Sequence, residues 1–154
     1  MLMPAIQHKD ELILLFSKEI YTEDYYFYEG YPHLNGIPKI ETSNNIYQWA
    51  IVDENKVVGY FAYHVDPFLD CADRFGLFSF DKGNPLIGID VFKKMETLIR
   101  NHHRIEWCVV DGNPVIKHYD KLCNKHHGTR YVFHDATKDP YGHYRNVIKY
   151  EIVT

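Results

Sequence analysis

Two short stretches of this chain have the residues and spacing of an anion-binding turn. The tripeptide Gly-Asn-Pro occurs at 83–85 and again at 112–114, and two aliphatic residues follow each copy. Asn is among the best helix N-cap residues, because its side-chain oxygen accepts a backbone N–H of the first turn. Pro is favoured at the first helical position, where its missing N–H would have no partner anyway. Each copy therefore predicts an elbow from a strand into a helix, with Asn84 and Asn113 as the N-caps.

The chemistry of such an elbow is anion binding. The free N–H groups and the dipole at a helix start both favour a negative charge. At the first elbow Leu86, Ile87 and Gly88 would present N–H groups, and Lys82 lies just upstream. Gly88 has no side chain, so a phosphate could approach its backbone closely. The same residues are equally consistent with a capped helix that binds nothing.

Hydrophobic periodicity and turn residues place the elbows in a chain that mixes helices and strands. The predicted order is a helix from Gln7 to about Tyr21, an aromatic loop, three strands with a hairpin turn at 53–56, a helix that ends near Asn101, a strand over 104–110, a shorter helix to about Leu122, and two strands around 138–142. This order predicts a mixed α/β fold.

Composition narrows the function further. The 154 residues carry a net charge of -4 and no linker-like segment, which predicts one domain over 1–154 without a basic surface for nucleic acid. No apolar run is long enough to cross a membrane. Three cysteines without paired spacing predict a reducing, cytoplasmic setting. The His residues include two adjacent pairs, whose side chains diverge, and none has zinc-ligand spacing, so no metal site is expected.

The second elbow carries a resemblance to a known family. The stretch VVDGNPVIKHYDKLC (109–123) resembles the GCN5-related N-acetyltransferase (GNAT) family, in which a hydrophobic strand precedes Asn-Pro, an aromatic-Tyr pair and Lys-Leu-Gly-Phe. The matching residues are Asn113, Pro114, Ile116, Tyr119, Lys121 and Leu122. The stretch departs from the family at His118 and Cys123. The resemblance covers roughly 47–153 and implies a GNAT-like acyl-CoA N-acyltransferase fold, with a mixed, mostly antiparallel sheet flanked by helices.

The resemblance implies acetyl-CoA as the acyl donor. In the family, the residue matching Asn113 contacts the pantetheine or pyrophosphate, and the one matching Tyr119 often protonates the departing thiolate. The pantetheine arm pairs with a strand that would here be 75–80. The remaining cofactor-binding residues implied are Phe78, Ser79, Phe80, Lys82, Gly83, Asn84, Leu86, Ile87 and Gly88. The first elbow is degenerate, since the family's loop has Arg or Gln, two residues, Gly, one residue, then Gly or Ala.

The acceptor side needs a base and a pocket. Asp73 is the predicted catalytic base, with His64 and Asp66 as alternatives, although each could equally be a solvated strand end. The Tyr-rich and acidic stretch 21–31 lies where the family builds its acceptor pocket. Its rings and carboxylates would suit a cationic amine, or they simply cover the sheet.

Together these features predict a cytoplasmic acetyl-CoA-dependent N-acetyltransferase. It would move the acyl group directly, in a ternary complex, to an amine of a small molecule or peptide. Two alternatives stay open: a catalytically inactive GNAT-like binding or regulatory module, and a small α/β protein-interaction domain. Neither nucleic acid nor membrane is an expected partner, and a homodimer is an open alternative.

Overall fold

The computed structural model describes residues 1–19, 38–139 and 141–154, and most of them form one mixed sheet with helices on both faces. The predicted acceptor stretch 21–31 lies outside the described residues. The sheet has the order β1-β2-β3-β4-β5-β7-β6. Its strands are β1 (Leu2–Pro4), β2 (Ile46–Asp53), β3 (Lys56–Asp66), β4 (Cys71–Ser79), β5 (Arg104–Val110), β6 (Thr129–Lys138) and β7 (Tyr144–Val153). The helices are η1 (Ala5–His8, a 3-10 turn), α1 (Lys9–Glu19), α2 (Pro85–Asn101) and α3 (Ile116–Lys125).

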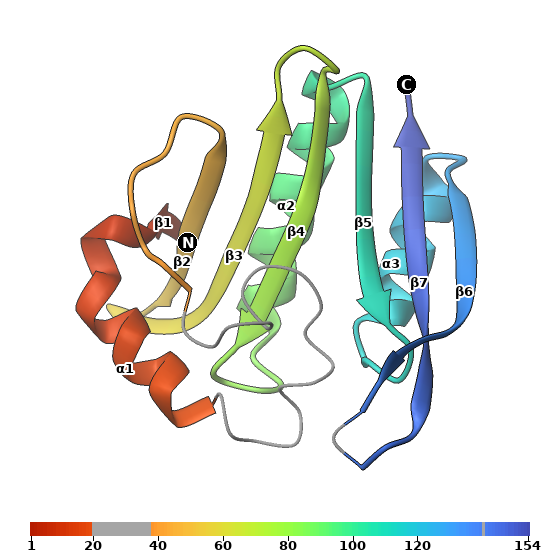
Figure 1. Ribbon diagram of the computed structural model, residues 1–154. Helices are drawn as coiled ribbons and strands as arrows, with labels where there is room; N and C mark the ends of the chain where they lie inside the picture. The colour runs from red at the N-terminus through yellow and green to blue at the C-terminus, as the bar shows by residue number, and fades with distance from the viewer. Residues whose placement is uncertain (20–37, 140) are drawn as a thin grey trace.

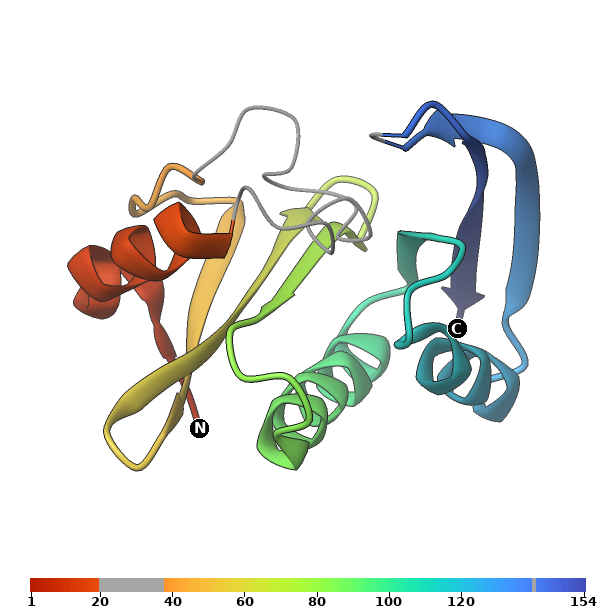
Figure 2. The same ribbon diagram turned by 90° about the horizontal axis from the view of Figure 1, so that it is seen from below.

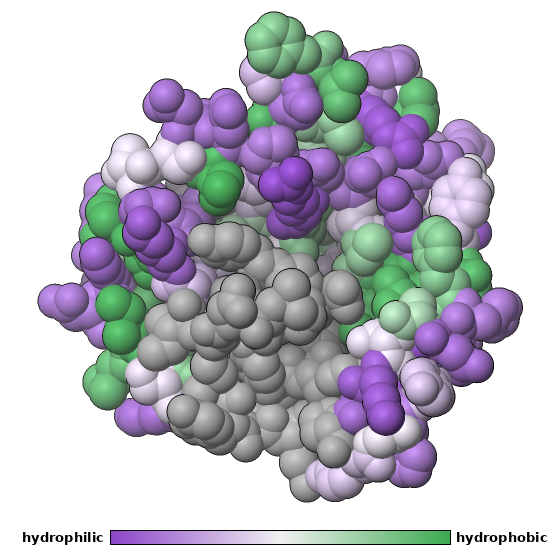
Figure 3. Space-filling model, viewed as in Figure 1, coloured by the Kyte–Doolittle hydropathy of each residue, from purple (hydrophilic) through white to green (hydrophobic). Residues whose placement is uncertain are grey.

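Two hydrophobic cores hold these layers together. Helix α1 lies on one face of the sheet and α2 and α3 lie on the other, as Figures 1 and 2 show. Leu12 and Phe16 of α1 pack against Tyr60 on β3 and other residues of the first core. Val91, Met95 and Ile99 of α2 belong to the second and larger core. Figure 3 shows hydrophobic side chains on the α1 face over β5, β7 and β6, which α1 does not cover.

The pairing of β4 with β5 positions the site. These strands are the parallel pair of the sheet, and they are in register only at Cys71–Arg104 and Ala72–Ile105. Beyond Ala72 the two strands diverge toward their carboxyl ends (Figure 1). A β-bulge accompanies the divergence, because the β3–β4 register shifts between Ala62 and His64. Arg74 has φ +54°, a left-handed conformation that bends β4 at this point.

The local predictions hold well where a turn or a helix boundary is marked by its own residues. The mixed, mostly antiparallel fold is confirmed, as is the hairpin turn, where Glu54 and Asn55 have φ 48° and 65°. Helix α2 ends at Asn101 as predicted, and β5 covers the predicted residues.

Three details are corrected by the structure. The N-terminal residues 2–4 form an edge strand on β2, which the sequence did not predict because the stretch is short and depends on its partner. The first helix begins as a 3-10 turn at Ala5, and its α-helical part is 9–19. Helix α3 continues to Lys125 instead of ending near Leu122. No helix within the described ranges is long and apolar enough to span a membrane.

Candidate active site

The first Gly-Asn-Pro forms the predicted elbow between β4 and α2. Asn84 is the N-cap of α2, and its Oδ1 accepts a hydrogen bond from the N–H of Leu86 at 3.0 Å. Pro85 is the first helical residue, and Gly83 has φ +85°, which suits glycine. The Asn84 side-chain amide donates to Asp53 at 3.1 Å and to Asp81 at 3.0 Å. The elbow is therefore tightly held, and two carboxylates lie beside the helix start.

The second Gly-Asn-Pro makes a different turn. Asn113 Oδ1 accepts a hydrogen bond from the N–H of Val115 at 3.0 Å, as an N-cap would. However, α3 begins only at Ile116, and the residue at its N-cap position, Val115, makes no side-chain cap. The prediction that Pro114 starts the helix is wrong. The backbone carbonyl of Asn113 instead accepts from Ile116, which closes a separate turn before the helix.

Both elbows border one cavity, which lies where β4 and β5 diverge. Its volume is about 860 Å³, a size typical of small-molecule and cofactor sites. The lining residues come from β4, the first elbow, α2, β5, the second elbow and α3: Phe75, Leu77, Ser79, Lys82, Gly83, Asn84, Pro85, Ile87, Gly88, Ile89, Phe92, Cys108, Val109, Asn113, Pro114, Val115, Lys117, His118 and Tyr119. Residues of both copies of the tripeptide thus line a single site.

Tyr119 brings a buried phenol to this cavity. Its ring makes edge-to-face contacts with Phe92, Trp107 and Tyr150 at centroid distances of 5.6–5.8 Å. Only 5% of its surface is exposed. Desolvation by burial raises the pKa of the Tyr119 hydroxyl far above its ordinary value, because the phenolate is disfavoured in an apolar environment. The hydroxyl is therefore protonated at neutral pH and can act as a proton donor.

Asp73 lies outside the cavity wall, on the α1 face of the sheet. It stands directly opposite His64 in the β3–β4 register. The Asp73 Oδ1 and His64 Nδ1 atoms are 2.7 Å apart. Asp66, the third candidate base, instead accepts the N–H groups of Phe68 and Leu69 in the turn that follows β3. The structure thus joins two of the three candidate bases and assigns the third to a turn.

Comparison with known proteins identifies the fold. The sequence matches no protein-family model and no curated protein. The structure is similar to an acetyltransferase of the GNAT family from Streptococcus pneumoniae, with a TM-score of 0.69 and 14% identity over 100% of this chain and 99% of that one. The chain has the GNAT fold. Its similarity to a protein described as a probable GNAT-family acetyltransferase from Chromobacterium violaceum ATCC 12472 has a TM-score of 0.67 and 14% identity, over 99% and 86% of the two chains.

A third structure with the GNAT fold has a named activity. It is the ribosomal-protein-S18-alanine N-acetyltransferase from Escherichia coli, with a TM-score of 0.60 and 14% identity over 73% of this chain and 71% of that one. At these identities the likeness establishes the fold and leaves the activity to be argued from the site.

Most of the predicted cofactor residues border the cavity of this GNAT fold. Seven of the ten line the cavity: Ser79, Lys82, Gly83, Asn84, Ile87, Gly88 and Asn113. A Cβ atom built on Gly88 would meet no atom within 4 Å, so its backbone faces open space. Phe78 and Phe80 lie on the other face, where their rings pack on Phe16 at 4.9 Å. Phe78 and Phe80 could therefore contact a donor only through their backbone. Leu86 is the third residue outside the seven, and its N–H is already bonded to Asn84.

Sequence reasoning missed the apolar walls and one cation of this GNAT-fold cavity. Phe75, Leu77 and Val109 line it from the diverging strands, and Phe92 lines it from α2. Lys117 lies in the first turn of α3, near the second elbow. Alternation along β4 could have indicated Phe75 and Leu77, but the wall they form depends on where β4 leaves β5. Among the described residues, no cluster of His, Cys, Asp or Glu is arranged to hold a metal.

Proposed function

We propose that this protein is an acetyl-CoA-dependent N-acetyltransferase, which transfers the acetyl group directly to an amine of a small molecule or peptide. One observation carries the proposal: a single cavity joins both elbows, the diverging strands and the protonated Tyr119. Structures of the same fold that are named as acetyltransferases support it.

The residues of the cavity suit such a donor. Beyond Ala72, β4 has no register partner on β5, so its backbone N–H and C=O groups can pair with the amides of a pantetheine arm. The apolar side chains of Leu77 and Val109 would pack against that arm. Lys82 and Lys117, one near each elbow, would bring positive charge toward the phosphates. When bound, acetyl-CoA would supply the thioester carbonyl.

Tyr119 would act as the general acid. As the amine nitrogen bonds to the carbonyl carbon, the carbon–sulfur bond breaks and its electron pair goes to sulfur. The Tyr119 hydroxyl would donate the proton that this sulfur requires, and general acid catalysis of this kind contributes ~10²–10⁴-fold in rate. Burial keeps the hydroxyl protonated and also keeps water away from the leaving group.

A second candidate function is a binding or regulatory module that has lost the donor. The observation that favours it is the pair of carboxylates, Asp53 and Asp81, bonded to the Asn84 side chain at the start of α2. Negative charge at this position opposes the binding of a pyrophosphate, because like charges repel at short range.

Thermal melting with ligand distinguishes the two functions. Acetyl-CoA at ~100 times its dissociation constant should add about 2.7 kcal/mol of stability. For a domain of this size that corresponds to a rise in Tm of about 5–10 °C. Acetyl-pantetheine, which lacks the nucleotide and pyrophosphate, is the matched control and should give a smaller rise. No rise with millimolar acetyl-CoA would contradict the enzyme and favour the module.

Turnover is then measured by release of the CoA thiol. The assay uses acetyl-CoA with a defined panel of amines: benzylamine, spermidine and tripeptides with N-terminal Ala or Ser. Thiol release that depends on one of these amines would support the transferase. Stabilisation by acetyl-CoA without release for any amine in the panel would show donor binding and contradict transfer to these amines.

A further inference from the structure

A His–Asp pair lies on the face of the sheet opposite Tyr119. His64 on β3 and Asp73 on β4 are cross-strand partners, and their Nδ1 and Oδ1 atoms are 2.7 Å apart. Both side chains are partly exposed, 20% for His64 and 24% for Asp73. The pair therefore combines a short polar contact with residual access from outside the core.

The pair lies at the apex of the diverging strands. Asp73 is the first residue of β4 beyond Ala72, which makes the last register contact with β5 at Ile105. The bulge at Arg74 follows at once, and Phe75 after it lines the cavity. The pairing of β4 with β5 ends at this segment of β4. The His64–Asp73 pair lies on one face of the segment and the donor cavity on the other, so the two are separated by the thickness of one strand.

The neighbouring positions on the α1 face are small. The next cross-strand partners after His64–Asp73 on this face are Ala62 and Gly76. The bulky rings of Tyr60 and Phe78 come only one pair further along the same strands. The two strands therefore place no large side chain of their own directly beside the pair on this face.

We propose that His64 removes the proton from the acceptor amine and that Asp73 orients its imidazole. This inference rests on the proposed acetyltransferase function. Asp73 accepts a hydrogen bond from Nδ1–H, which leaves Nε2 with its lone pair as the proton acceptor. His64 is then the catalytic residue, and Asp73, the predicted base, is a positioning residue.

The protons and electrons of the step balance. The amine nitrogen forms its bond to the carbonyl carbon and gives one proton to His64 Nε2. The carbon–sulfur bond breaks, and sulfur takes its proton from Tyr119 on the other face. The turnover leaves an imidazolium and a phenolate, which return to neutral by exchanging one proton through solvent. The amine enters from the α1 face and the thioester from the face covered by α2 and α3.

Few other charges lie along these strands near the pair. On β3, Asp66 lies two residues further along the same face, and on β4 Arg74 is the next residue after Asp73. On β2 the register partner of His64 is Ile46, which does not ionise. From α1, Glu11 bonds to the N–H of Val57 at the far end of β3. The His64–Asp73 contact therefore has few charged neighbours on the strands that carry it.

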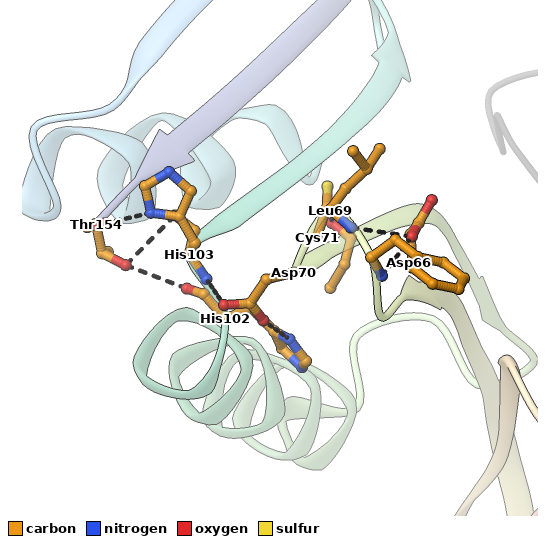
Figure 4. Close-up of polar contacts among 9 residues, drawn as sticks. Asp66, Leu69, Asp70, Cys71, His102, His103 and Thr154 are labelled. Carbon is orange, nitrogen blue, oxygen red and sulfur yellow. Dashed lines mark hydrogen bonds and ion pairs between the residues drawn. The ribbon is translucent and has the colours of Figure 1, made fainter.

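The chain offers a second His–Asp pair as a control, in the turns that precede β4 and β5. His102, just after α2, has its Nδ1 at 3.0 Å from Oδ1 of Asp70 in the turn before β4 (Figure 4). Asp70 also accepts the N–H of His103 at 3.1 Å. The hydrogen bond from His102 and then the one from His103 lower the pKa of Asp70. Asp70 and His102 precede the paired residues of β4 and β5, whereas Asp73 follows them, so the control pair has the same chemistry away from the point where the strands diverge.

The test compares His64→Ala with His102→Ala in the full chain. For the amine that supports turnover, His64→Ala should lower kcat by ~10²–10⁴-fold. The rise in Tm given by acetyl-CoA should be unchanged, and added imidazole should restore part of the rate. His102→Ala should leave kcat within about twofold, as for a surface substitution.

Asp73→Asn should lower kcat less than His64→Ala does and leave the KM for acetyl-CoA unchanged.

The possible results separate the inference from the proposed function. Full turnover of His64→Ala would overturn the role of His64 while leaving the acetyltransferase intact. Equal losses in both histidine variants, with lower Tm and no rescue by imidazole, would mean that the pair is only structural. A wild-type protein without stabilisation by acetyl-CoA and without thiol release would overturn the proposed function, and the role of His64 with it.

Discussion

The two Gly-Asn-Pro elbows have the same tripeptide and differ in what they build. At the first, Asn84 caps a helix of 17 residues that starts directly at Pro85. At the second, the capping contact of Asn113 precedes a separate turn, and a helix of 10 residues starts two residues after Pro114. The tripeptide therefore specifies a sharp exit from a strand, while the residues after it decide where the helix begins.

The elbows also differ in the charges that surround them. The first holds its Asn84 amide between two carboxylates, whereas the cavity wall next to the second carries Lys117 and His118. The first elbow gains rigidity from these contacts and loses attraction for an anion. We infer that the second elbow contributes more to the donor site than the first does.

Tyr119→Phe tests the contribution of the second elbow and its helix, and it should have the largest effect on activity. Removal of the hydroxyl from the helix after the second elbow should lower kcat by ~10²–10⁴-fold, because the thiolate loses its proton donor. The Kd for acetyl-CoA, measured by calorimetry, should stay nearly the same. Tyr131→Phe, which removes an exposed hydroxyl bonded to Glu151, is the control and should keep full activity. Full turnover by Tyr119→Phe would exclude it as the acid.

Asn84→Ala and Asn113→Ala compare the elbows in stability. Loss of the N-cap at Asn84 should cost about 1 kcal/mol in the free energy of unfolding, since the N–H of Leu86 loses its acceptor. Asn113→Ala should cost less, because the N–H that loses its acceptor belongs to Val115, which precedes the first residue of α3. Urea denaturation with a common m-value measures both. Equal costs would mean that the two elbows are energetically alike.

Asp81→Asn tests the contribution of the first elbow to acetyl-CoA binding, and its expected effect is the smallest. Removing one carboxylate beside the start of α2 should tighten acetyl-CoA binding about twofold to fivefold, by roughly 0.5–1 kcal/mol, a size typical of charges near an exposed helix end. The effect should shrink in high salt. Asp10→Asn on α1 removes a charge on the other face of the sheet and should leave the Kd unchanged. An unchanged or weaker Kd for Asp81→Asn would mean that the carboxylate does not oppose the phosphates.

The parts of the site that could be predicted are those determined by residues adjacent in the sequence. Seven of the ten predicted cofactor residues and Tyr119 line the cavity, because the motif residues close to each elbow in the sequence also lie close to it in space. The side of the sheet on which Phe78 and Phe80 lie could not be predicted. This region has apolar side chains on both faces, and the sequence does not say which face packs against which helix. The pairing of His64 with Asp73 also escaped prediction, because it depends on the register of β3 and β4 across a bulge.

The sequence by itself determined the first elbow, the hairpin turn at 54–55 and the extent of β5, each of which depends on the propensities of adjacent residues. Only the tertiary structure decided that both elbows face one cavity and that β4 leaves β5 after Ala72. It also decided which candidate base has a partner. These features arise from strand pairing between segments far apart in the chain, and such pairing is stabilised by the packing of the whole sheet, which no local stretch of residues encodes.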